Sequence, residues 1–238
     1  REYASCGDRR GAARTALCLA YAHADRGNDA VASGHFARAG RMLDELPESP
    51  EHGFRAWMIA AGALRRGDNS LARKMAESAL AIGNRLGDAE TRAMATLWLG
   101  HVLLTEGLLE DGIAMLDEAS ALVGAGGLSP LASGIIYCSV IFACRNRADW
   151  RRAHEWTQVA DGWCSRESIG YFPGLCRVHH AEVLRFRGEF EEAERDALKA
   201  LDQLTAAWPR RVYWAHQELG EIRLRRGDIE CAEAACGR

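Results

Sequence analysis

One stretch near the middle of the chain decides the fold. Residues 97–119 read LWLGHVLLTEGLLEDGIAMLDEA, with small residues at Gly100, Gly112 and Ala119 around a turn signal at Gly107. Glycine readily adopts the left-handed conformation that ends many helices, and small side chains let two helices approach closely. The stretch therefore predicts a helix, a tight turn at Gly107 and a second helix.

The same turn recurs along the whole chain. Its copies stand 40, 40, 41, 40 and 39 residues apart, at Gly27, Gly67, Gly107, Ala148, Gly188 and Gly227. Small residues follow five positions later at Ala32, Ala72, Gly112, Ala153, Ala193 and Ala232, and twelve positions later at Ala39, Ala79, Ala119, Ala160 and Ala200. Seven positions before the turn stand Ala20, Ala60, Gly100, Ile141, Ala181 and Gly220. Three columns fixed to one turn are typical of a repeat protein.

We therefore predict an all-α, right-handed α-solenoid of about six helix-turn-helix repeats with a period of about 40 residues. The repeats cover residues 11–48, 50–88, 89–127, 129–167, 171–208 and 210–238, and together form a single superhelical domain over residues 1–238. Strand signals are nearly absent, and all five prolines fall between repeats, where they interrupt no helix. The last repeat stops within its second helix and the chain opens without Met, so we expect a fragment of a longer polypeptide.

The pattern of residues in each repeat resembles the tetratricopeptide repeat (TPR). It is seen as Leu99, Gly100, Gly107, Gly112 and Ala119, and again as Leu219, Gly220, Gly227 and Ala232. The repeat here, at about 40 residues, is longer than the 34 residues common in that family. The resemblance implies stacked helix pairs whose first helices line a concave face.

A second resemblance covers nearly the whole chain. It is carried by residues 128–130, 134–138, 143–144, 149, 152–153, 155–157 and 163–164, and by Cys176, Val178, His179, Ala181, Glu182 and Leu184 before Gly188. These segments are similar to the helical-repeat region of large bacterial LuxR-type and cyclase-linked ATPase transcriptional regulators. The resemblance implies a nucleotide-binding domain upstream and, in LuxR-type members, a helix-turn-helix downstream.

Composition and charge exclude several classes of protein. The chain has 48% hydrophobic and 26% charged residues, as ordinary folded proteins do, which excludes extensive disorder. Its formal charge of −3 lacks the basic excess of a nucleic-acid-binding surface. The longest weakly polar stretch, residues 132–144, is shorter than the roughly 20 residues of a membrane-spanning helix. We expect a cytoplasmic protein that binds neither nucleic acid nor membrane directly.

The sequence carries no recognisable catalytic or metal-binding motif. A phosphate-binding loop is missing its Lys after Gly7 and Gly11, and the His154-Glu155 pair has Gln158 where a zinc-binding H-E-x-x-H motif needs histidine. The eight cysteines include no C-x-x-C pair, so we interpret them as reduced thiols packed as small hydrophobes rather than as a metal or redox site. We predict no enzymatic activity, no cofactor and no metal.

The predicted binding site is the concave groove. Its candidate residues are Trp57, His101, Phe142, Arg145, Glu182, Arg185, Trp214, Gln217 and Glu221, with Leu97, Cys138 and Val178 on the same face. Aromatic, Arg and Glu side chains together suit a peptide or a small polar molecule. One alternative stays open: Trp57, Phe142 and Trp214 either line the groove or fill gaps between helices. Two columns of arginine recur near the ends of the A helices. Arg65, Arg145 and Arg185 are candidates for an anion-facing ladder, whereas the column one residue before the turn is interpreted as interacting with the helix C-terminal dipole; it consists of Arg26, Arg66, Arg147, Arg187 and Arg226. His180 either lines the groove or makes a satisfied polar contact.

These features predict a ligand-sensing or protein–protein interaction module of a LuxR-type transcriptional regulator. An effector or partner in the groove would change the contacts of the repeats, and a homo-oligomer is compatible with such a regulator. The alternative is a stand-alone TPR adaptor that binds a peptide or protein partner. It would share every feature of the repeats and lack attached domains.

Overall fold

The structure, a computed structural model, describes residues 7–167 and 172–237. Within these residues every regular element is helical, which confirms the predicted all-α fold of helical hairpins. The helices are α2 (Arg9–Asp25), α3 (Asp29–Leu43), α4 (Pro50–Arg65), α5 (Asn69–Leu86), α6 (Ala89–Thr105), α7 (Leu109–Gly124), α8 (Pro130–Asn146), α9 (Trp150–Glu167), α10 (Phe172–Arg187), α11 (Phe190–Ala207), the 3₁₀-helix η1 (Pro209–Arg211), α12 (Val212–Arg225) and α13 (Ile229–Cys236).

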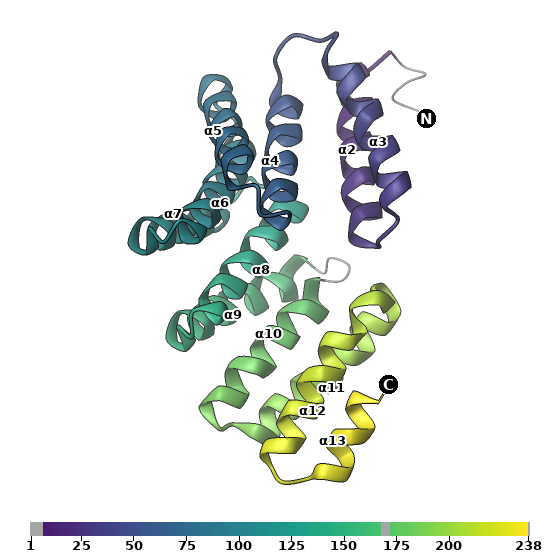
Figure 1. The fold of residues 1–238 in the computed structure, drawn as a ribbon, viewed down its shortest axis with the longest axis vertical. Coiled ribbons are helices and arrows are strands. Elements are labelled where there is room, and N and C mark those ends of the chain that lie inside the picture. The colour runs from purple at the N-terminus through teal and green to yellow at the C-terminus, as the bar shows by residue number, and fades with distance from the viewer. Residues whose placement is uncertain (1–6, 168–171, 238) are drawn as a thin grey trace. The chain divides into compact units, whose positions relative to one another are not determined.

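The chain groups into two compact units, unit 1 with residues 1–132 and unit 2 with residues 133–238. Unit 1 holds the hairpins α2/α3, α4/α5 and α6/α7, and unit 2 holds α8/α9, α10/α11 and α12/α13, apart from the first residues of α8. The two helices of each hairpin run antiparallel (Figure 1). The first helix of a hairpin is its A helix and the second is its B helix. That the repeats form one continuous domain stays a prediction.

All six hairpin turns close in the same way. The turn residue has a positive φ between 57° and 83°, and the N–H of the next residue donates to the carbonyl five residues upstream, as in Asn28 to His23 and Asp228 to Arg223. This is the Schellman arrangement, which satisfies carbonyls at the end of the A helix. Five turns have glycine at this position, and Ala148 is the one non-glycine residue with a positive φ in the described part of the chain.

The columns of small residues lie where the helices meet. Every residue five and twelve positions after a turn, and every residue seven positions before it, is buried. One close approach is in hairpin α6/α7, where a Cβ at Gly112 would lie 2.8 Å from Leu104 Cδ2 and 3.0 Å from the Gly100 carbonyl oxygen. The small columns therefore set the spacing between the A and B helices.

Four of the five prolines expected between repeats in fact lie at the starts of helices. Pro50, Pro130 and Pro209 are the first residues of α4, α8 and η1, and Pro173 is the second residue of α10. Proline is well tolerated at this position, because its missing N–H would have no partner within the helix and its fixed φ suits the helix. These prolines therefore help to define where A helices start.

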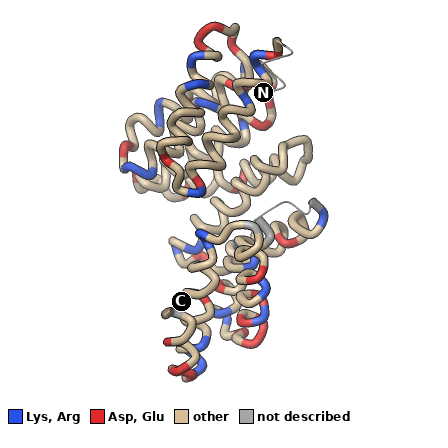
Figure 2. The backbone as a smooth tube through the Cα atoms, turned by 90° about the vertical axis from the view of Figure 1, so that its right-hand side faces the viewer, with Lys and Arg blue, Asp and Glu red and all other residues tan. Residues whose placement is uncertain are grey.

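Charged residues of both signs alternate along the surface of each unit rather than gathering by sign (Figure 2). Of the cysteines, Cys144, Cys164 and Cys176 are buried, Cys18 and Cys138 are half-buried and Cys231 is exposed, whereas Cys6 lies outside the described residues. Cys164 and Cys176 are in contact, with their sulfur atoms 3.4 Å apart. No helix in the described part of the chain is long and apolar enough to cross a membrane.

Candidate functional site

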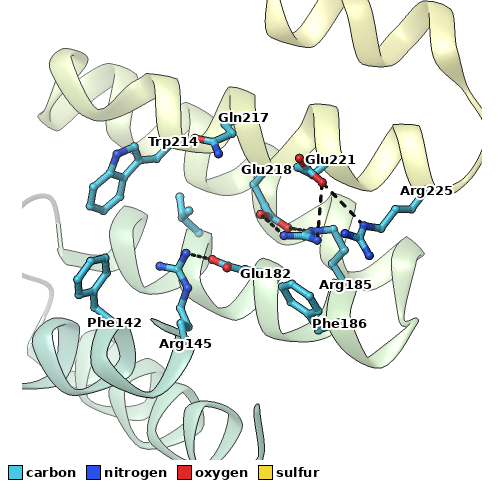
Figure 3. A pocket seen from close by; sticks show the side chains of 11 residues that line it. Phe142, Arg145, Glu182, Arg185, Phe186, Trp214, Gln217, Glu218, Glu221 and Arg225 are labelled. Carbon is cyan, nitrogen blue, oxygen red and sulfur yellow. Dashed lines mark hydrogen bonds and ion pairs between the residues drawn. The ribbon is translucent and has the colours of Figure 1, made fainter. Parts of the chain in front are cut away.

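A pocket of about 430 Å³ opens in unit 2, between the A helices α8, α10 and α12. Figure 3 shows aromatic side chains at one end and paired charged side chains at the other. The lining residues are Phe142 and Arg145 from α8, Val178, Glu182, Arg185 and Phe186 from α10, and Trp214, Gln217, Glu218, Glu221 and Arg225 from α12. The lining side chains of these three successive A helices therefore converge on one space.

Seven of the nine predicted site residues line this pocket. They are Phe142, Arg145, Glu182, Arg185, Trp214, Gln217 and Glu221. Their spacing in the sequence brings them together because each A helix repeats after about 40 residues. That they bind a ligand stays a prediction.

The other two predicted residues belong to unit 1 and lie outside the lining of this pocket. Trp57 is only 4% exposed; its ring stacks on Phe54 at 4.7 Å between centroids and meets Tyr21 edge-on. Trp57 thus takes the gap-filling role that the sequence left open. His101 packs beside Trp98, its Nε2 is buried without a hydrogen bond among the described residues, and burial lowers its pKa to about 4.

The centre of the charged end is a buried ion pair. Arg185 donates to both carboxylate oxygens of Glu218, from Nε at 2.6 Å and from Nη2 at 3.2 Å. Both side chains are 6% exposed. Burial raises the pKa of Glu218, while the hydrogen bonds from Arg185 act in the opposite direction. A two-pronged pair with this geometry is held rigidly, and it fixes α10 against α12.

A second ion pair crosses from α8 to α10. Arg145 contacts the carboxylate of Glu182 through Nη2, and its Nη1 lies 2.8 Å from Nδ1 of the buried His179. Burial, with a contribution from Arg145, lowers the pKa of His179 to about 3. The imidazole is therefore neutral at physiological pH, and its Nδ1 accepts a hydrogen bond from the guanidinium.

The sequence-based alternative of an anion-facing arginine ladder does not match these pairings. Arg145 and Arg185 are each neutralised by a glutamate within the pocket. Arg65 is exposed and belongs to unit 1. Arg145 and Arg185 are therefore members of ion pairs within the pocket and are not arranged as a row of unpaired cations.

Aromatic rings lie beside the two ion pairs, Arg145 with Glu182 and Arg185 with Glu218. Phe142 is 44% exposed and Phe186 is 41% exposed, although both are large and apolar. The Arg185 guanidinium lies 4.5 Å from the centre of the Phe186 ring, and that of Arg211 lies 4.9 Å from the Trp214 ring. Exposed rings beside ordered charges provide both stacking surface and hydrogen-bonding groups.

Sequence reasoning missed three lining residues, namely Phe186, Glu218 and Arg225. Glu218 and Arg225 lie on the face of α12 that carries Trp214, Gln217 and Glu221, as their three- and four-residue spacings indicate. A helical-face analysis of residues 212–225 would have found them. The same spacing predicts Phe186, which stands four residues after Glu182 and eight after Val178 in α10.

His180 makes a satisfied polar contact outside the pocket lining. Its Nδ1 is 2.5 Å from Asp196 Oδ2, and Arg177 also pairs with Asp196 at 3.2 Å. In the parts of the chain that the structure describes, no group of three or more His, Cys, Asp or Glu side chains has a metal-binding arrangement. The chemistry that the pocket offers is therefore stacking, hydrogen bonding and charge pairing.

Comparison with known proteins identifies the fold only. No family model matches the chain, and no curated protein matches its sequence. Among solved structures, BtubC (BKLC) from P. vanneervenii superposes with a TM-score of 0.64 at 14% identity, covering 97% of this chain and 89% of that one. A protein from Podospora anserina with kinesin light chain TPR-like repeats gives 0.62 at 14% identity, covering 80% and 94%.

A third solved structure is part of a larger protein. The signal transduction ATPase with numerous domains (STAND) from Pyrococcus horikoshii, which has a tetratricopeptide repeat sensor, gives a TM-score of 0.58 at 17% identity. The match covers 94% of this chain and 35% of that chain. The described hairpins are thus similar to TPR-like repeats, in agreement with the resemblance seen in the sequence.

Proposed function

We propose that this chain is the effector- or partner-binding module of a bacterial LuxR-type transcriptional regulator. In this proposal it acts in the cytoplasm, binds its ligand in the unit 2 pocket and catalyses no reaction. The observation that carries it is the pocket itself, where three successive A helices contribute paired charges and exposed aromatic rings to one space.

The geometry supports a sensing role because the pocket walls belong to three different hairpins. Arg145 and Glu182 join α8 to α10, and Arg185 and Glu218 join α10 to α12. A ligand that contacts these side chains interacts with all three hairpins at once. Its binding energy would favour one packing of the hairpins over others, as a change of assembly state requires.

The LuxR-type context rests on the sequence resemblance around residues 128–188 and on the similarity to the sensor-bearing STAND ATPase. A stand-alone adaptor is the second candidate. The match to BtubC favours this candidate. Because that match covers 89% of the BtubC chain, a protein of similar length consists almost entirely of this fold.

Native mass spectrometry of the 238-residue chain with a metabolite and peptide extract of its source cell tests ligand binding. We expect a discrete added mass that is retained by Arg151→Ala, whose side chain is 74% exposed, and lost in Phe142→Ala and in Arg145→Ala. Equal retention in all three variants would contradict this site. Sequencing of the coding region on both sides then separates the regulator, with an upstream ATPase and a downstream helix-turn-helix, from the adaptor.

A further inference from the structure

The charges that line the pocket cancel. Three arginines, Arg145, Arg185 and Arg225, face three glutamates, Glu182, Glu218 and Glu221. The first two arginines are already hydrogen-bonded or in contact with Glu182 and Glu218. A ligand with net charge would gain little attraction here and would have to break an existing pair, so an uncharged ligand is favoured.

The remaining hydrogen-bonding capacity lies along one edge of α12. The Glu221 carboxylate is 3.9 Å from Arg185 and 3.8 Å from Arg225, both beyond hydrogen-bond distance. Among the described residues, Gln217 also makes no hydrogen bond through its exposed amide. The edge therefore offers an amide, a carboxylate and a guanidinium, which together can accept from N–H groups and donate to carbonyl groups.

The spacing along this edge matches an extended polypeptide. Gln217, Glu221 and Arg225 are four residues apart, which places them about 6 Å from one another along the helix axis. An extended chain advances about 6.7 Å for every two residues. Peptide N–H and C=O groups that face the same side of an extended ligand can therefore meet these side chains in succession.

The aromatic end of the pocket determines which type of ligand side chain fits best. Phe142 and Trp214 lie on opposite sides of this end in Figure 3. Val178, which also lines the pocket, belongs to the hydrophobic cluster against which Trp214 packs. Arg145 lies 6.0 Å from the Phe142 ring centre and Arg211 lies 4.9 Å from that of Trp214. An aromatic side chain of the ligand can stack on the exposed Phe142 ring and the half-buried Trp214 ring and present its electron-rich face to these guanidiniums, which an aliphatic side chain cannot do.

We infer that the ligand of this pocket is an extended peptide segment with an aromatic side chain flanked by uncharged residues. The aromatic side chain enters between Phe142 and Trp214, and the backbone runs along Gln217, Glu221 and Arg225. The inference rests on the proposed function and narrows it to one class of ligand.

Four blocked pentapeptides test the inference against the full 238-residue chain by isothermal titration calorimetry. The reference is Ac-Ser-Gln-Phe-Gln-Ser-NH₂, and the others replace its Phe by Ala, both Gln by Glu, or both Gln by Lys. We expect the reference to bind best, the Ala peptide to bind about tenfold more weakly through loss of the ring, and both charged peptides to bind more weakly than the reference. Stronger binding of either charged peptide, or equal binding of the Ala peptide, would overturn the inference.

Matched variants locate the binding. Phe142→Ala and the double variant Glu221→Gln/Arg225→Gln should each weaken binding of the reference peptide at least severalfold, while Leu224→Ala should not. Leu224 is a suitable control because it is large, apolar, 55% exposed and on α12, but outside the pocket lining.

If none of the four peptides binds, the inference is overturned as well. The proposed function has a separate test, since a compound from the cell extract that binds in a Phe142-dependent manner would support the site while excluding the peptide class. Loss of both signals would reject the site itself.

Discussion

The two units share one backbone plan but fill the same repeat position with different chemistry. Three residues before each turn, unit 1 has Ala24, Leu64 and Leu104, whereas unit 2 has Arg145, Arg185 and Leu224. Leu64 packs against the core cluster of Ala63, Ala72 and Val102, and Leu104 packs on Gly112. In unit 2, the two arginines instead reach the pocket and pair with glutamates.

The difference shows which positions the fold constrains. Columns that face the partner helix in a hairpin are buried in both units and, apart from Ile141, hold small residues, because a larger side chain there would push the helices apart. Positions three and six residues before the turn are apolar in some repeats and charged in others, as Leu104 and Arg145 show. A binding site can therefore be built on this scaffold by changing two columns without altering the hairpins.

The largest expected effect comes from breaking the buried pair of Arg185 and Glu218, which has no counterpart among the described residues of unit 1. Glu218→Ala leaves the guanidinium of Arg185, which is 6% exposed, without its partner. We expect a loss of about 3–5 kcal/mol in the free energy of unfolding of unit 2, since an uncompensated buried charge is costly. Urea denaturation followed by circular dichroism measures this loss.

The control for that prediction is the exposed pair of Arg151 and Glu155, at 74% and 56% exposure. Glu155→Ala should cost less than about 1 kcal/mol, because solvent screens such pairs. The double variant Arg185→Met/Glu218→Leu gives unit 2 the apolar character of unit 1 at these positions. It should recover most of the stability but not the ligand binding, and a fully destabilised double variant would contradict the comparison.

The second prediction concerns pH, because burial lowers the pKa of a histidine in each unit. Burial lowers the pKa of His101 in unit 1 to about 4, and burial together with Arg145 lowers that of His179 in unit 2 to about 3. Below the ordinary pKa of about 6.5 the unfolded chain takes up a proton at each site and the folded chain does not. Stability is therefore fully present above about pH 6.5 and decreases as the pH falls toward these values, by up to about 1.4 kcal/mol per pH unit for each histidine.

Urea denaturation between about pH 7.5 and 5 gives this slope. His101→Gln and His179→Gln should each reduce it, and the double variant should reduce it by the sum. An unchanged slope in His179→Gln would show that this imidazole is not held neutral in unit 2.

Much of this architecture could be predicted from the sequence, because the turn and its three small columns repeat with the chain. Gly107 and Gly112 illustrate this. Gly107 adopts the left-handed backbone conformation that the turn requires, and Gly112 leaves room for the close approach of α6. The site was less predictable. Arg145 and Arg185 could be placed on the correct face, but their pairing with Glu182 and Glu218 depends on how neighbouring A helices are offset, which no spacing within one helix specifies. Trp57 shows the same limit: its helical face is predictable, whereas its burial depends on Phe54 and Tyr21.

The third prediction tests the close approach of helices in unit 1. Gly112→Ala puts a Cβ 3.0 Å from the Gly100 carbonyl oxygen and 2.8 Å from Leu104, so we expect a loss of about 1–3 kcal/mol of stability. In unit 2 the equivalent Ala153 is accommodated, as its full burial shows. Gly34→Ala is the control, because Gly34 lies in α3 with no atom within 4 Å of the added Cβ. It should stabilise the protein by about 0.5–1 kcal/mol, since alanine favours helix.

The smallest expected effect concerns the turns. Five of them have glycine at the left-handed position, but hairpin α8/α9 of unit 2 has Ala148 with a φ of 57°. The left-handed conformation costs a residue with a Cβ about 1–2 kcal/mol, while glycine costs about 0.5–1 kcal/mol more backbone entropy on folding. Ala148→Gly should therefore stabilise unit 2 by about 0.5–1 kcal/mol, and Gly107→Ala should destabilise unit 1 by a similar amount. Thermal and urea unfolding of the two variants provide the comparison, and destabilisation by Ala148→Gly would mean that the methyl group of Ala148 makes a contact worth more than its strained backbone.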